Sequence, residues 1–328
     1  MNVRRHYIST AALAAVTALG LGTLTACSSD SAAAGDTGKF DVVASFYPMA
    51  FLAERIGGEH VSVTSLTEPG QEPHDLEISA RQTAQLEESD AALYLKGLQP
   101  SVDEAIGQSP VATKIDAATL TTLEEHGTEA GGHEEEHAED EHAEEEHAHE
   151  HEHEGGKDPH VWLDPVKYAE VAEGVGKAFE KADPDHAADY RKNTAALVGE
   201  LNDLDEKFET GLADRKNSVF ITTHAAFGYL AERYGLTEEA ISGLDPESEP
   251  SGARVKELQK MAKADGVTTV FYETLVSDRT ARTLAGDTGL KTDVLDPLEG
   301  ITDASRGDDY FQVMEANLKA LQTALGTK

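Results

Sequence analysis

Cysteine is nearly absent from this chain, which has one Cys among 328 residues. A single thiol excludes a disulfide framework, a zinc cluster built from cysteines and a CxxC redox pair. The chain also lacks the G-x-S-x-G turn of acyl-transferring hydrolases and a glycine-rich phosphate loop. The sequence therefore gives no support for thiol, acyl-transfer or phosphoryl-transfer chemistry.

Basic residues are also scarce. Lys and Arg together number 27 against 62 Asp and Glu, which gives a formal net charge of −35. Such a chain repels phosphate backbones and attracts cations, so nucleic acid is excluded as a partner. Hydrophobic residues make up only 39% of the chain, which indicates that part of it lies outside any packed core.

The N-terminal segment is typical of a secretory signal. Arg4 and Arg5 precede an apolar stretch that is too short and too interrupted for a membrane-spanning helix. It ends in Leu-Thr-Ala-Cys, which resembles the bacterial lipobox. We predict a signal peptide over residues 1–26, a lipid on Cys27 and a flexible tether over residues 27–39. Plain secretion with a chance cysteine is the alternative. The sequence does not decide whether Arg4 and Arg5 direct the chain to the export route for folded proteins.

Beyond the tether, short apolar runs alternate with helical patterns, as in βαβ units with a parallel sheet. The predicted strands cover residues 40–45, 61–66, 91–96, 114–117, 218–223, 268–272 and 292–295. The predicted helices cover residues 48–57, 79–89, 165–181, 225–234, 251–265, 278–287 and 308–325.

One further predicted helix, over residues 185–214, is unusually long. Apolar side chains from Leu197 to Phe208 recur at spacings of three and four. At ~1.5 Å per residue this helix is about 40 Å long, enough to run along two lobes. We therefore expect an α/β protein with two lobes, residues 40–184 and 215–328. Each lobe has a mostly parallel sheet flanked by helices, and the long rigid helix joins them.

The composition changes abruptly between Glu124 and Glu154. This segment holds 8 of the 14 His and 15 acids, with no Lys or Arg. It has no apolar face to bury, so we expect a disordered loop over residues 124–156. The stretch from His133 to His137 matches the H-E-x-x-H signature of metalloproteases. That motif works on a helix with a buried face, and repeated His/Glu sequence produces the pattern by chance.

Four positions follow a strand or a tight turn and carry a metal-ligating side chain: His74, His160, His224 and Asp296. Ligands of open parallel sheets collect beyond the carboxyl ends of the strands, so these residues can converge in a cleft between the lobes. Three imidazoles with one carboxylate suit zinc, whereas manganese and magnesium favour more oxygen ligands. Each residue alone is also compatible with an ordinary polar turn, so spacing by itself does not decide whether these residues bind a metal.

The motifs around these residues resemble the zinc-specific branch of the cluster A-I solute-binding proteins, the extracytoplasmic receptors of zinc and manganese ABC importers. The resemblance runs from about Phe40 to the C-terminus, and the motifs occur in the family's order at Glu72–Asp75, Asp158–Pro165, Thr223–Tyr229 and Leu295–Leu298. It implies two α/β lobes bridged by one rigid helix, with a permease and an ATPase as partners.

The resemblance also implies the ligands of the transported metal. In the family, residues at the positions of His74, His160 and His224 bind Zn²⁺, and an acid at Asp296 can complete the shell. Manganese receptors of the family carry Glu where this chain has His224, so the resemblance favours zinc over manganese.

Two further acids and the histidine-rich segment are additional candidates. Glu273 can serve as an alternative oxygen ligand or as an acceptor for a ligand histidine, and Glu72 is a weaker candidate for the metal. The acidic segment resembles the His-rich insertion of zinc receptors, which implies weak zinc capture; a solvated spacer is the alternative. Deletion of residues 127–154 is then expected to remove the weaker zinc equivalents. The histidines concerned are His133, His137, His142, His147, His149, His151 and His153.

The sequence thus predicts a monomeric, lipid-anchored, extracytoplasmic receptor that captures Zn²⁺ for an import permease and is not an enzyme. A manganese-preferring receptor, a zinc hydrolase and a surface adhesin are the alternatives. A hydrolase needs an open coordination position for water, whereas four protein ligands favour carriage of the metal.

Overall fold

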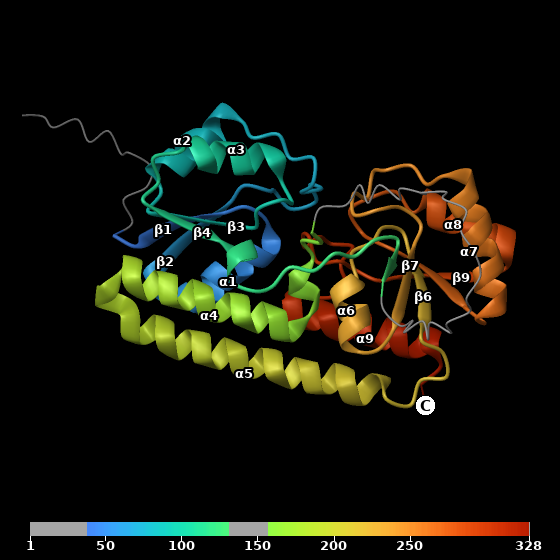
Figure 1. Cartoon of the computed structure of the whole chain (residues 1–328). Helices are drawn as coiled ribbons and strands as arrows, with labels where there is room; N and C mark the ends of the chain where they lie inside the picture. The colour runs from blue at the N-terminus through green and yellow to red at the C-terminus, as the bar shows by residue number, and fades with distance from the viewer. Residues whose placement is uncertain (1–37, 131–156, 328) are drawn as a thin grey trace, which may run out of the picture. The chain divides into compact units, whose positions relative to one another are not determined.

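The structure of the protein, a computed structural model, describes residues 38–130 and 157–327. Within these ranges lie two sheets of largely parallel strands, each flanked by helices, and one long helix that joins the two lobes (Figure 1). The predicted fold class is confirmed. The predicted signal peptide and Cys27 lie outside the described residues. No helix within the described ranges is long and apolar enough to cross a membrane.

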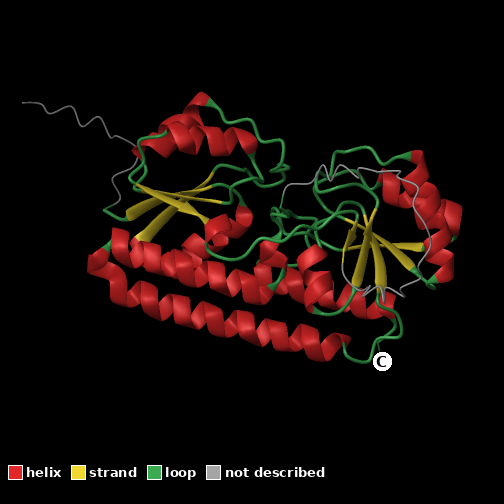
Figure 2. Ribbon diagram, viewed as in Figure 1, coloured by secondary structure: helices red, strands yellow, loops and turns green. Residues whose placement is uncertain are grey.

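The first sheet has the strand order β2-β1-β3-β4, with every pair parallel. Its elements are β1 (Phe40–Ala44), α1 (Tyr47–Gly57), β2 (Val61–Ser65), α2 (Ala80–Glu88), β3 (Ala91–Tyr94), α3 (Pro100–Gln108) and β4 (Thr113–Asp116), with α4 (Pro165–Ala182). Side chains alternate along β1: Val42 and Ala44 pack in one core, and Val43 packs in another with residues of α2 and α3. Both faces are apolar because helices cover both (Figure 2).

The second sheet has the order β5-β7-β6-β8-β9 and is parallel except for β5. Its elements are β5 (Glu129–Ala130), β6 (Val219–Thr222), α6 (Gly228–Arg233), β7 (Thr237–Ala240), α7 (Gly252–Ala264), β8 (Thr269–Tyr272), α8 (Arg279–Thr288), β9 (Lys291–Val294) and α9 (Tyr310–Leu325). Ile221 and Val270 pack with residues of α7 and α8, whereas Phe220 and Phe271 share a core with α6 and α9. The strands β5 and β7 and the helix α3 are not predicted by the sequence patterns.

Polar residues fix where several helices begin. Asp164 accepts hydrogen bonds from the backbone N–H groups of Val166 and Lys167 and so caps α4, with Pro165 in its first turn. Ser251 caps α7, as predicted, and Asp309 caps α9. The cap on α4 matters for function because the chain just before Asp164 contains His160. Short 3₁₀ turns complete the chain at Gly58–His60, Ala117–Thr119, Val161–Leu163 and Pro184–His186.

The long helix α5 (Ala187–Leu212) joins the lobes. It packs against α1 and α4 of the first lobe and against α9 of the second, and its apolar stripe from Leu197 to Phe208 is fully buried. Asn193 donates to the carbonyl of Ile56 in α1, 3.0 Å away, and the far end of α5 accepts a hydrogen bond from α9 at the carbonyl of Gly211. One apolar core is continuous through both lobes. A wide hinge motion would expose this core to water, so the fold favours small movements.

Candidate metal centre

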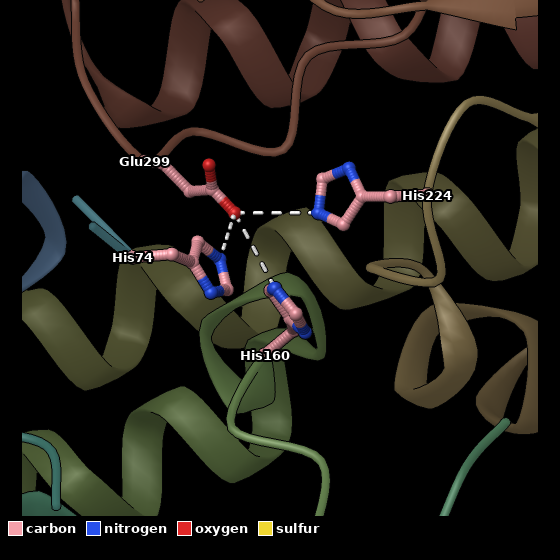
Figure 3. A group of neighbouring side chains, drawn as sticks. All are labelled: His74, His160, His224 and Glu299. Carbon is pink, nitrogen blue, oxygen red and sulfur yellow. Dashed lines mark hydrogen bonds and ion pairs between the residues drawn. The ribbon is translucent and has the colours of Figure 1, made fainter. Parts of the chain in front are cut away.

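Three imidazoles and one carboxylate meet between the two lobes: His74, His160, His224 and Glu299 (Figure 3). We call this group the three-histidine site. Oε1 of Glu299 lies 3.1 Å from Nε2 of His74, 3.3 Å from Nε2 of His160 and 3.4 Å from Nε2 of His224. The structure thus brings together the three histidines that the sequence singled out, although up to 150 residues separate them along the chain.

Loops at the carboxyl ends of parallel strands carry three of the four residues. His74 follows β2, His224 follows β6 and Glu299 follows β9, as expected for ligand positions in open α/β sheets. His160 directly precedes the 3₁₀ turn that leads into α4. Because the two lobes each contribute residues, the site depends on how the lobes are held together.

Glu72 shapes the turn that carries His74. Its carboxylate accepts hydrogen bonds from the backbone N–H groups of His74 and Asp75, at 3.1 and 3.2 Å. Glu72 was a candidate ligand in the sequence analysis, but it is not among the four converging residues. In the structure its role is to fix the backbone that presents the imidazole.

Two buried carboxylates orient the imidazoles of His160 and His224. Nδ1 of His160 lies 2.7 Å from Oδ1 of Asp158, and Nδ1 of His224 lies 2.8 Å from Oε1 of Glu273. With Nδ1 held by a carboxylate, Nε2 faces Glu299 and is the nitrogen that can bind a metal once it has lost its proton. This carboxylate–imidazole arrangement is the one that fixes metal-binding histidines. The structure places Glu273 as such an acceptor, one of its two predicted roles, whereas the sequence analysis did not identify Asp158.

Three polar atoms at the centre of the site, two nitrogens and one oxygen, form no hydrogen bond. The side chains of His160, His224 and Glu299 are at most 2% exposed, and that of His74 is 11% exposed. Nε2 of His160, Nε2 of His224 and Oε2 of Glu299 are buried without a hydrogen bond, which is uncommon in folded proteins. Zinc with ligand distances of about 2.0–2.1 Å has tetrahedral donor–donor edges of about 3.3 Å. The observed separations from Glu299 match that geometry.

The electrostatics of the site favour a positive charge at its centre. Burial opposes charge on His160, but Asp158 and Glu299 outweigh burial and raise the pKa of His160 to about 9. The same competition, with Glu273 and Glu299 as the anions, raises the pKa of His224 well above its ordinary value. Burial acts to raise the pKa of Glu299, but the three imidazoles lower it well below the usual range. The metal-free site therefore holds protons where a cation can bind.

Asp296, the predicted fourth ligand, lies in the same turn but serves a different role. Its Oδ1 accepts from the backbone N–H of Leu298 at 2.9 Å, and its Oδ2 accepts from the hydroxyl of Thr274 at 3.2 Å. Leu298 has φ of 61°, the one positive value outside glycine among residues 38–130 and 157–327. This turn, held by Asp296, directs Glu299 into the site. The structure therefore places Glu299, and not Asp296, beside the three imidazoles.

Trp162 connects this turn to the segment that carries His160. Its Nε1–H donates to the carbonyl of Pro297 at 2.7 Å, and its own carbonyl accepts from the hydroxyl of Tyr310 at 2.7 Å. The indole is fully buried and packs edge-on against Phe46, with ring centroids 5.0 Å apart. The first and second lobes are thus bonded to each other beside the site, which limits how far the donors can separate.

The predicted capture histidines His133, His137, His142, His147, His149, His151 and His153 lie outside the described residues. The described part of the acidic segment differs from the expected loop. Residues 124–130 are ordered, and Glu129–Ala130 pairs antiparallel with β7.

Known proteins share much of this chain's sequence and fold. Residues 42–324 match the family model described as the zinc-uptake complex component A, periplasmic. The zinc-binding lipoprotein AdcA of Streptococcus pneumoniae is 36% identical over 305 residues, which cover 91% of this chain and 58% of that protein. The chain thus spans less than two thirds of that relative's length.

Two other relatives are covered almost completely. The high-affinity zinc uptake system protein ZnuA of Bacillus subtilis is 36% identical over 296 residues, with 88% of this chain and 89% of that protein covered. The crystal structure of the Zn(II)-bound ZnuA-like domain of Streptococcus pneumoniae AdcA superposes with a TM-score of 0.69 and 33% identity, covering 88% of this chain and 99% of that one.

Proposed function

This chain belongs to the family of periplasmic zinc-uptake complex components A, and on that premise we propose that it is an extracytoplasmic zinc receptor. It binds one Zn²⁺ in the three-histidine site and delivers the ion to the permease of an ABC importer driven by a cytoplasmic ATPase. The observation that carries this proposal is the convergence of buried imidazoles on one carboxylate: the Nε2 atoms of His160 and His224 lie 3.3 and 3.4 Å from Oε1 of Glu299.

The ligand set supports zinc and carriage of the metal. Three nitrogens and one oxygen from His74, His160, His224 and Glu299 form a set that suits zinc, whereas manganese favours more oxygen ligands. Catalytic zinc sites keep a coordination position for water, but here a fourth protein side chain lies at that position. A receptor is therefore favoured over a hydrolase.

The proposal is tested by counting metals. Native mass spectrometry of the protein is expected to show one Zn²⁺ that survives a moderate chelator. A manganese-loaded sample treated with the same chelator is expected to lose its metal. Retention of manganese but not zinc would reassign the receptor to manganese, and retention of neither would contradict a receptor function.

Zinc affinity is expected to rise with pH across the neutral range. The metal-free His160 keeps its proton up to a pKa of about 9, whereas an ordinary histidine loses it near pH 6.5. Each displaced proton changes the apparent affinity by up to about tenfold per pH unit below the folded pKa. We expect about a tenfold increase between pH 6.5 and 7.5, measured by chelator competition, with proton release seen as a buffer-dependent enthalpy in calorimetry.

The direction of this pH dependence follows from which state of the protein binds the proton. The raised pKa stabilises the folded, metal-free protein below about pH 6.5, and this stabilisation is lost as pH rises through about 9. Zinc competes with that proton, so its binding strengthens over the same interval. An affinity that is flat between pH 6.5 and 7.5 would show that the site imidazoles are not protonated before the metal binds.

The N-terminal segment supplies the remaining part of the proposal. Lipidation at Cys27 would hold the receptor on the outer face of the cell membrane, next to its permease. A Cys27→Ser variant is expected to lose acyl labelling and to be released into the medium, whereas continued membrane retention would contradict the anchor.

The acidic, histidine-rich segment within residues 124–156 is a separate matter. We retain weak zinc capture by its histidines as a proposal. Its test is better done by exchanging those histidines than by deleting residues 127–154, because Glu129–Ala130 belongs to the second sheet.

A further inference from the structure

A second group of metal-competent side chains lies outside the three-histidine site. Glu124, His126 and Glu232 each offer one donor atom, and these donors lie within 4.8 Å of one another. His126 precedes β5, and Glu232 lies on α6. The proposed receptor function does not use any of these three residues.

The imidazole of His126 is held in the same way as the imidazoles of the three-histidine site. Its Nδ1 lies 2.7 Å from Oδ2 of Asp158, and its Nε2 lies 3.2 Å from Oε2 of Glu232. Its side chain is only 8% exposed. A buried carboxylate on Nδ1 and a second carboxylate oxygen opposite Nε2 is the arrangement already seen at His160 and His224.

The surrounding chain provides room for this imidazole. A Cβ at Gly228 would come within 2.5–2.8 Å of His126, so any side chain at that position would displace the ring. The ring of Tyr229 packs edge-on at 4.6 Å, and its hydroxyl donates to the carbonyl of Asp158 at 2.8 Å. The ring of His126 is therefore seated by the fold and does not lie free on the surface.

The charges around His126 suit a divalent cation. Three carboxylates surround the ring, those of Glu124, Glu232 and Asp158, and the neighbouring cation is Lys167, 2.6 Å from Oε1 of Glu124. The local charge with neutral His126 is then −2. One nitrogen and two oxygens form a mixed ligand set for zinc or a similar cation, with positions left for water.

We propose that Glu124, His126 and Glu232 form a second, weaker site for Zn²⁺, which we call the outer site. Asp158 joins the two sites, because its Oδ1 accepts from His160 and its Oδ2 from His126. The outer site is more exposed, with side-chain exposures of 35% for Glu124 and 54% for Glu232. It is therefore expected to bind and release zinc faster than the three-histidine site.

The test removes competing histidines without shortening the chain. The background variant carries Gln at His133, His137, His142, His147, His149, His151 and His153. Zinc titration followed by native mass spectrometry is expected to show one tight and one weaker equivalent. Glu232→Gln, an exposed change that leaves the core intact, is expected to weaken the second equivalent at least tenfold, and His126→Ala is expected to abolish it. Lys167→Met removes the competing cation and is expected to strengthen the second equivalent several-fold.

Controls separate this inference from the proposed function. His186→Ala, which removes a surface histidine paired with Asp183, is expected to leave both equivalents. His224→Ala is expected to remove the tight equivalent and leave the weaker one. A background variant that binds a single zinc, or a second zinc that survives both Glu232→Gln and His126→Ala, would overturn the outer site. Absence of the tight equivalent would instead count against the proposed receptor function.

Discussion

His224→Ala is expected to lower the affinity of the tight zinc by about 10²–10³-fold. Four-ligand zinc sites bind with about 10–16 kcal/mol, so one ligand contributes about 2.5–4 kcal/mol, which corresponds to roughly this factor. The variant is also expected to be less stable, because Glu273 accepts from Nδ1 of His224 at 2.8 Å and would keep a buried charge without that partner. Competition with a chelator of known zinc affinity measures the change.

A matched control separates ligand loss from unfolding. His186→Ala removes an imidazole of similar chemistry from the surface, where it pairs with Asp183, and is expected to leave the tight affinity unchanged. Circular dichroism of metal-free His224→Ala should show a folded protein. A folded variant that still binds zinc as tightly as the original chain would exclude His224 as a ligand.

Glu299→Gln and Asp296→Asn are expected to have very different effects. Glu299 supplies the single carboxylate of the site, so its replacement leaves a zinc complex with charge +2 in a buried position. We expect an affinity loss of about 10²-fold, by the same per-ligand reasoning. Asp296→Asn keeps an oxygen that can accept from Leu298, so its effect on zinc affinity is expected to stay within about tenfold.

The two variants together decide which acid completes the shell. Affinities from chelator competition and unfolding curves of the metal-free proteins should be measured in parallel. Asp296→Asn is expected to lower the free energy of unfolding by about 1 kcal/mol through weaker hydrogen bonds in the turn. If Asp296→Asn abolishes tight binding while Glu299→Gln retains it, the ligand assignment from the structure is reversed.

The sequence allowed the three histidines to be singled out because each follows a strand or a tight turn in a recognisable motif. The structure places His74, His160 and His224 around one carboxylate. The choice between Asp296 and Glu299 depends on the backbone of a single turn. Leu298 adopts φ of 61°, which local sequence does not indicate for a leucine. That reversal turns the chain so that Glu299, three residues after Asp296, reaches the site.

A strand with buried charged residues could likewise not be predicted from its local sequence. The strand β7 has the sequence Thr-Glu-Glu-Ala, which lacks the apolar pattern of a buried strand. Glu238 is nevertheless fully buried, with its carboxylate bonded to the hydroxyl of Thr222 and the backbone N–H of Phe227. Burial raises the pKa of Glu238 to about 7. Only tertiary partners make this polar segment a strand.

The residue at which the acidic segment leaves the folded lobe could also not be predicted from local sequence patterns. Glu124, His126 and Glu129 share the composition of the residues that follow, so no local pattern separates them from that stretch. In the structure this stretch bonds to distant residues: the backbone N–H of Glu124 donates to Tyr229, and His126 to Asp158. By contrast, the bounds of the long helix were predicted closely, because apolar residues at spacings of three and four indicate a helix with one buried face.

The most direct measurement is anomalous diffraction at the zinc edge from crystals of the zinc-loaded protein. We expect one strong peak within about 2.0–2.2 Å of Nε2 of His74, His160 and His224 and of a carboxylate oxygen of Glu299. A strong peak bonded to Asp296 in place of Glu299 would contradict the assigned shell. A tight zinc site away from all three imidazoles would show that the three-histidine site is not the zinc-binding site.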